Sequence, residues 1–215
     1  MLNKKIKSFI GFGIIIIITS INIIGCSKES DLLQVSSYFP IDKSIVYEFE
    51  GTQTDKQTNE IKEIATQFEQ KGKSQVSGKD VYTRKETYFD DLKNNILEYE
   101  VYFNYDNEGN IYQLGRKVNG EIELYDTPGV YLHNANIGDI YETIDGDTIE
   151  IKAIEDLNID DKVYDNCILV EKNFYDEKKL ERKEQLYLQK DFGLIKYVEE
   201  SFTDDYKIKL NYKNK

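Results

Sequence analysis

In Leu97-Glu98-Tyr99-Glu100-Val101-Tyr102-Phe103-Asn104-Tyr105, every odd position is apolar or aromatic and the even positions are mostly polar. Successive side chains of a β-strand point to opposite faces, so this alternation predicts a half-buried strand. The same period of two recurs without exception from Tyr206 to Tyr212 and again from Thr148 to Ala153. These segments are amphipathic as strands and would not be amphipathic as helices.

Short turn-forming clusters separate the alternating segments. Asn-Gly and Asp-Gly pairs supply the positive φ angles that tight hairpins require. The clusters are Asp106–Asn110, Asn119-Gly120, Thr127-Pro128-Gly129, Asp145-Gly146-Asp147, Asp176–Lys179 and Thr203–Asp205. Strand and short turn, repeated, predict an all-β fold with a single antiparallel meander sheet and little helix. Because each strand has one apolar face to cover, we expect a strongly curved sheet, either half-barrel or sandwich-like.

One segment, residues 59–70, fits two structures. Ile61, Ile64, Ala65 and Phe68 would form the apolar stripe of a helix, whereas Ile64, Thr66 and Phe68 would share one face of a strand. The strong alternation on both sides of the segment favours a strand.

The first 26 residues have the layout of a secretory signal. Three lysines and no acid precede an apolar run from Phe9 to Ile18. The segment ends in Ile23, Ile24, Gly25 and Cys26, which resembles the lipobox of bacterial lipoproteins. This resemblance implies that Ile23, Ile24 and Gly25 form the signal-peptidase recognition sequence and that the thiol of Cys26 receives a diacylglyceryl group.

The predicted domain boundaries follow from this signal. Residues 1–25 would be cleaved, residues 26–36 would form the lipidated cysteine and a polar tether, and residues 37–215 would form one β domain. The alternative is an uncleaved membrane anchor over residues 6–24, which has about the length needed to cross a bilayer. A plain anchor does not need Gly-Cys at its outer end, so we expect lipid anchoring to the outer face of the cell membrane.

The charge of the mature chain limits its partners. Residues 1–25 contain three lysines and no acid, so about 25 basic and 40 acidic residues remain after cleavage. A strongly negative surface argues against nucleic acid as a partner and against direct adsorption to anionic lipid. The acidic composition also keeps a soluble domain dispersed, and this is the favoured explanation.

No set of residues forms a recognisable catalytic or metal site. His133 is the single histidine, and Cys167 is the single cysteine after Cys26 and lies in a strand-like segment typical of the core. Residues 106–117 depart from a calcium-binding loop, because Lys117 stands where a glutamate ligand is required. We therefore predict a non-enzymatic protein without catalytic residues, metal or cofactor, and the sequence identifies no ligand-binding residue.

Tyrosine is the abundant residue that these considerations leave unexplained. The chain has 17 tyrosines, and several strands carry them on both faces, as at Tyr82, Tyr88, Tyr99, Tyr102 and Tyr112. Tyrosine is common at recognition surfaces because it joins a large apolar ring to a hydroxyl group. One face could thus line a groove, or tyrosine could simply serve as a good strand-forming residue.

Two motifs resemble known proteins. Residues 38–51, which contain Tyr38-Phe39-Pro40-Ile41-Asp42-Lys43, and residues 184–196, which end in Phe192-Gly193-Leu194-Ile195-Lys196, are similar to the first and last motifs of uncharacterised β-rich surface lipoproteins from low-GC Gram-positive bacteria. The chain departs from them at Ser44 and Ile45, near where glycine and tryptophan are usual. The resemblance implies a curved sheet like the half-barrel of lipoprotein carriers, with a concave surface.

Three functions remain open from the sequence. The leading hypothesis is a binding or scaffold module for an envelope protein partner. The second is a carrier that holds a lipid or other amphiphile in a continuous apolar cavity of the concave sheet. A carboxylate-dependent cell-wall hydrolase is the third, and it requires two acidic side chains that converge in a cleft.

Overall fold

The computed structural model describes residues 32–90 and 94–213. The predicted signal peptide and the lipobox residues Ile23, Ile24, Gly25 and Cys26 lie outside the described residues. The elements are α1 (Val35–Tyr38), β1 (Ile45–Asp55), β2 (Ile61–Val76), β3 (Lys79–Phe89), β4 (Asn95–Tyr105), β5 (Ile111–Val118), β6 (Glu121–Leu132), β7 (Ile140–Glu142), β8 (Thr148–Ile159), β9 (Lys162–Asp176), β10 (Lys179–Gln189), β11 (Gly193–Ser201) and β12 (Tyr206–Tyr212). Among these residues, no helix combines the length and apolar character of a membrane-spanning segment.

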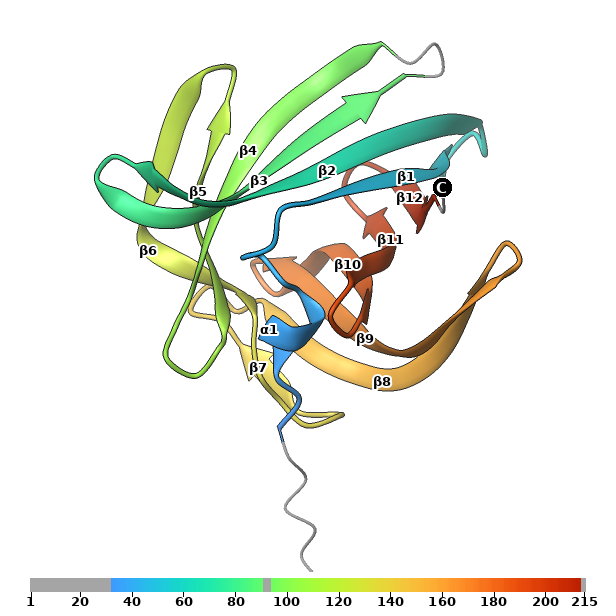
Figure 1. The fold of residues 1–215 in the computed structure, drawn as a ribbon. Helices are drawn as coiled ribbons and strands as arrows, with labels where there is room; N and C mark the ends of the chain where they lie inside the picture. Colours follow the sequence, from blue (N-terminus) through green and yellow to red (C-terminus); the bar gives the residue numbers. More distant parts are fainter. Residues whose placement is uncertain (1–31, 91–93, 214–215) are drawn as a thin grey trace, which may run out of the picture. The chain divides into compact units, whose positions relative to one another are not determined.

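All described strands belong to one antiparallel sheet, which confirms the predicted fold class. The strand order is β6-β5-β4-β3-β2-β1-β12-β11-β10-β9-β8-β7. Strands β1–β6 and β7–β12 are thus two meanders, and the pairing of β1 with β12 joins them. The sheet curls but does not close, because β6 and β7 stand at its two ends although they follow each other in the sequence (Figure 1).

The predicted alternation decides which side chains enter the core. In β4, Val101 and Phe103 are buried in the main apolar cluster, and Tyr99 and Tyr105 pack against it. The segment with two possible structures is a strand, since β2 spans Ile61–Val76 and pairs with both β1 and β3. In β4, the alternation of apolar and polar residues therefore predicted correctly which strand face points to the core.

The chain enters the domain earlier than the predicted boundary at residue 37. The amide of Leu33 donates to the carbonyl of Ala135 at 3.1 Å, and the amide of Val35 donates to Asn134 Oδ1 at 2.8 Å. Val35 is completely buried, and Phe39 and Ile41 continue into the main core. Residues 33–36, which the sequence placed in the tether, are part of the folded domain because Val35 is a core residue.

One predicted turn is instead an irregularity within a strand. Thr127, Pro128 and Gly129 lie inside β6, where Gln113 pairs with Gly129 but Gly115 pairs with Leu124. Four residues of β6 therefore oppose a single residue of β5. Proline has no backbone N–H to contribute to a ladder and is tolerated on an edge strand such as β6. The other predicted turn clusters connect consecutive strands.

Gly193 permits close packing between the start of β11 and the core. It has a φ of +112°, and a Cβ there would lie 2.6 Å from the hydroxyl oxygen of Tyr47. That hydroxyl donates to the carbonyl of Phe192.

Cys167 lies in a second, smaller apolar cluster with Tyr164 and Ile195, and burial raises the pKa of its thiol to about 11. The prediction that Cys167 is a core residue is confirmed.

Candidate functional site

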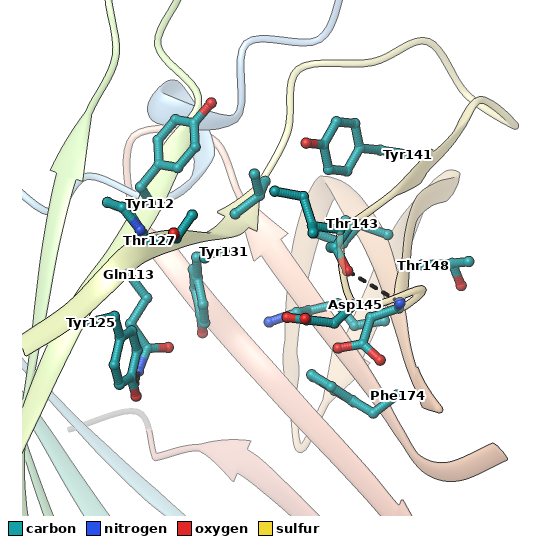
Figure 2. A pocket seen from close by; sticks show the side chains of 17 residues that line it. Tyr112, Gln113, Tyr125, Thr127, Tyr131, Tyr141, Thr143, Asp145, Thr148 and Phe174 are labelled. Carbon is teal, nitrogen blue, oxygen red and sulfur yellow. Dashed lines mark hydrogen bonds between the residues drawn. The ribbon is translucent and has the colours of Figure 1, made fainter. Parts of the chain in front are cut away.

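The two ends of the curled sheet border a cleft, called the seam cleft below. It has a volume of about 540 Å³ and is lined by residues of β5 and β6 on one side and of β7, β8 and β9 on the other. Figure 2 shows Tyr112, Tyr125 and Tyr131 on the side of β5 and β6, and Tyr141, Thr143 and Asp145 on the other side. The volume lies within the usual range of small-molecule sites.

Four tyrosines form the walls of the seam cleft. Tyr112 donates its hydroxyl to Asp106 Oδ2 at 3.3 Å, and Tyr125 accepts a hydrogen bond from Gln113 Nε2 at 3.1 Å. Tyr141 stacks on His133, with ring centroids 4.3 Å apart and planes inclined by 16°. The irregular part of β6 brings Tyr125 to this position, because the three extra residues of β6 carry the chain away from the β5 ladder.

Lys172 is a buried cation beside the cleft. Its Nζ lies 4.1 Å from the ring centroid of Tyr131 and 3.7 Å from Glu184 Oε2. Burial lowers the pKa of Lys172, and the neighbouring carboxylate of Glu184 partly opposes this effect. At the rim, Asp147 Oδ1 accepts the amide of Tyr175 at 2.9 Å. The cleft thus combines aromatic walls with both signs of charge.

A second cavity of about 520 Å³ continues from the cleft along the concave face of the sheet, and Gln113, Tyr125 and Tyr131 line both. Its floor carries a buried ion pair in which Arg84 Nε donates to Glu86 Oε1 at 2.7 Å. We call Arg84, Glu86, Lys172, Arg182, Glu184 and Glu199 the charged belt. Charged side chains are rarely buried unless they are paired.

The hydrogen bonds of Glu86 and the aromatic neighbours of Arg84 complete one half of the belt. Glu86 Oε2 accepts from the hydroxyl of Tyr99 at 2.7 Å and of Tyr88 at 3.2 Å. The guanidinium of Arg84 lies 5.0 Å from the ring centroid of Phe103 and also faces three other aromatic rings. Burial alone would lower the pKa of Arg84, but the carboxylate of Glu86 and the nearby Tyr131 and Tyr99 together raise it.

The other half of the belt is satisfied in the same way. Glu184 lies 3.5 Å from Arg182 and 3.7 Å from Lys172, whereas Glu199 accepts hydrogen bonds from Tyr197 and Tyr206. Burial and the nearby carboxylates raise the pKa of Tyr197. Each carboxylate of the belt is thus engaged by cations or tyrosine hydroxyls, and a hydrolase that uses two free carboxylates finds no such pair in the belt.

The five tyrosines for which a groove and a simple strand-forming role were both open lie in different surroundings. Tyr88 and Tyr99 line the second cavity and Tyr112 lines the seam cleft. Tyr82 packs against Tyr105 instead, and the hydroxyl of Tyr102 donates to Glu100 at 3.3 Å. Within the part of the chain that the structure describes, no three His, Cys, Asp or Glu residues form a group that could hold a metal ion.

The sequence did not point to the charged belt. In the sequence, nothing distinguishes Arg84, Glu86, Lys172 and Glu184 from the other charged residues of this acidic chain. A signal exists in hindsight, because Arg84 and Glu86 occupy the same strand face as Tyr82 and Tyr88.

No protein-family model matches the chain, and no curated protein sequence matches it. Among solved structures, an inferred exported protein from Bacteroides fragilis with a YmcC-like fold superposes with a TM-score of 0.50 and 11% identity, over 81% of this chain and 96% of that chain.

Two further solved structures show weaker likeness. An inferred lipoprotein from Parabacteroides distasonis has a TM-score of 0.45 and 11% identity, over 81% of this chain and 96% of that chain. A DUF1329 family protein from Desulfovibrio piger has a TM-score of 0.35 and 12% identity, over 81% of this chain and 86% of that chain. The comparisons thus show that this chain shares the fold of the Bacteroides fragilis protein.

Proposed function

We propose that the chain is a lipid-anchored extracytoplasmic binding protein, and that it binds a segment of an envelope protein partner in the seam cleft. The observation that supports this proposal best is the cleft itself, which lies between two sheet ends and has tyrosine walls. The resemblance to lipoproteins of low-GC Gram-positive bacteria rests on two sequence motifs and stays a prediction.

The signal sequence and Cys26 support the location. The solved structure with the same fold is described as that of an exported protein, which is consistent with an extracytoplasmic place. From Cys26 to Leu33 there are seven residues, so the domain would lie within about 25 Å of the lipidated cysteine. A ligand would therefore be met close to the outer face of the membrane.

Removal of the thiol tests this anchor. We expect a Cys26→Ala precursor to lose labelling by radioactive palmitate and to keep its full length, because the acyl acceptor is gone. Labelling in cells and the mass of the purified protein measure both effects. Unchanged labelling and size would show that Cys26 is not lipidated.

The cleft suits a polar partner better than an acyl chain. A carrier of lipids requires a continuous apolar cavity, but Lys172, Asp145 and Asp147 line this one. The apolar part of the concave side is already filled by the main core, to which Val35, Phe39 and Ile41 contribute. An acyl chain buried against charged groups would displace the water bound to them and offer no hydrogen bonds in return, which costs free energy.

Two features favour an extended peptide as the partner. Strands β6 and β7 end the sheet order, and a terminal strand can pair with an added strand. Tyr125 and Tyr141 offer ring surface and hydroxyls for the side chains of such a peptide. The paired carboxylates of the charged belt support binding without catalysis.

Site-specific photocrosslinking in intact cells tests the site. We expect p-benzoylphenylalanine at position 125, in the cleft wall, to give a protein adduct of reproducible mass. The same group at position 202 is the matched control, because Phe202 is 38% exposed and does not line the cleft. Mass spectrometry of the adducts identifies the partner.

A second variant connects the adduct with the cleft. Ile144 lines the cleft and is 90% exposed, so Ile144→Asp should leave folding unchanged and reduce the adduct at position 125 at least threefold. Equal adducts at positions 125 and 202, or adducts with lipid alone, would contradict the proposed binding of a protein partner.

A further inference from the structure

Three exposed apolar side chains lie within a few residues of the bridge at which the chain enters the domain. Leu32 is 49% exposed, Ile137 is 51% exposed and Ile140 is 64% exposed. The bridge between Leu33 and Ala135 places Leu32 beside the segment that begins at residue 136. We call Leu32, Ile137 and Ile140 the tether patch.

A tight turn holds the two isoleucines close to this bridge. The amide of Asp139 donates to the carbonyl of Asn136 at 3.2 Å, and Asp139 Oδ2 accepts from both nitrogens of Asn136. The amide of Gly138 donates to the carbonyl of Ile151 at 2.8 Å, which fixes the turn on β8. Ile137 and Ile140 therefore sit on a braced turn.

The seam cleft does not use these side chains. Leu32, Ile137 and Ile140 are not among its lining residues, and none of them belongs to either apolar cluster. Neighbouring apolar side chains that remain exposed to water can form a surface that contacts another apolar phase. The tether patch is therefore free to contact an apolar surface outside the domain.

The length of the preceding chain indicates which occupant this is. Cys26 precedes Leu32 by six residues, which span at most about 21 Å when fully extended. We propose that the tether patch docks on the bilayer surface that holds the acyl chains of Cys26. This inference rests on the lipid anchor of the proposed function. A short tether gives the patch a high effective concentration at that surface.

Charge does not drive this docking. Residues 132–147, which contain both isoleucines, include no lysine or arginine and four acids, among them Asp139 and Glu142. This segment therefore offers no attraction to anionic lipid, and apolar burial is the proposed driving force. We expect docking on phosphatidylcholine that persists in 0.5 M salt, since screening weakens only electrostatic contacts.

The chain contains no tryptophan, so a single substitution creates a unique fluorescent probe. Ile140→Trp reports on the tether patch. Ile96→Trp is the matched control, because Ile96 is 62% exposed, close to the 64% of Ile140. Both probes are placed in the full lipidated protein, in phosphatidylcholine vesicles with brominated acyl chains.

The two probes lie in different parts of the fold, Ile140 at the start of β7 and Ile96 near the start of β4. The turn after β4 contacts Asn134, which lies just before the tether-patch isoleucines. The amide of Asn134 donates to Asn110 Oδ1 at 2.8 Å, and Asn134 Nδ2 donates to the carbonyl of Glu108. Tyr105 is the end of β4 nearest that turn. Ile96 is nine residues from Tyr105 and therefore lies about 30 Å from it along the strand. A docked patch brings Ile140 to the lipid and keeps Ile96 in water.

We expect bromine to quench Ile140→Trp at least twofold more than Ile96→Trp, in low and in high salt. Equal quenching of the two probes, or quenching that disappears in 0.5 M salt, would overturn the docking. The lipid mass on Cys26 and flotation of the protein with vesicles report on the anchor separately. Loss of these two signals overturns the anchor, whereas flotation with equal quenching overturns the tether patch alone.

Discussion

Replacing Arg84 with methionine should lower the free energy of unfolding by about 3–5 kcal/mol, the usual effect of removing one partner of a buried ion pair. Arg84 is 7% exposed and Glu86 is 3% exposed, so the carboxylate left behind would be desolvated without its cation. The aromatic rings of Phe68 and Phe103 would also lose the cation that lies over them. Urea unfolding followed by circular dichroism measures the change.

A double variant separates the charge from the shape of the side chains. Arg84→Met with Glu86→Leu removes both charges and should recover most of the lost stability, because apolar replacements of a buried pair are often neutral or stabilising. Tyr88 and Tyr99 would lose their common acceptor, so full recovery is not expected. A loss below about 1 kcal/mol in the single variant would show that the pair is solvated.

Replacing Gly51 with alanine should destabilise the fold by more than about 3 kcal/mol, beyond ordinary overpacking. A Cβ at this position would lie 1.8 Å from the carbonyl oxygen of Lys209 and 2.9 Å from the Cα of Leu210. These are backbone atoms of β12, which cannot rotate away as a side chain can. The ladder of β1 and β12 joins the two meanders, so its disruption affects the whole sheet.

Gly129 provides the matched control for Gly51. It also lies within a strand, and a Cβ there would have nothing within 4 Å. Gly129→Ala should therefore change the unfolding free energy by less than about 1 kcal/mol. Thermal unfolding of both variants makes the comparison, and similar melting temperatures would contradict the close contact between β1 and β12.

Local patterns predicted the strands well because burial repeats every two residues along each of them. Val101 and Phe103, or Ile149 and Ile151, are inward neighbours two positions apart, and both pairs are buried. The segment of residues 59–70 had two possible structures because its apolar residues satisfy both periods. Pairing with β1 and β3 selected the strand, and this pairing depends on residues outside the segment.

The tether boundary and the candidate site were harder to predict. The burial of Val35 depends on residues about a hundred positions later in the chain. Asn134 accepts the amide of Val35, and Ala135 forms a β-bridge with Leu33. Arg84 and Glu86 break the apolar alternation of β3, so the period of two could not show that their face is the inward one. Thr127-Pro128-Gly129 has the composition of a turn. The segment lies within an irregular edge strand because β5 pairs with β6 on both sides of the irregularity.

Taken alone, the sequence determined the all-β class, most hairpins and the inward face of the apolar strands, since these depend on side chains a few residues apart. It also contains the predicted signal peptide and Cys26, on which the proposed anchor depends. Only the tertiary structure decided the pairing of β1 with β12, the contact of Lys172 with Tyr131 and the cleft between the ends of the sheet. These features join residues far apart in the chain, and their energies depend on distances that no local periodicity encodes.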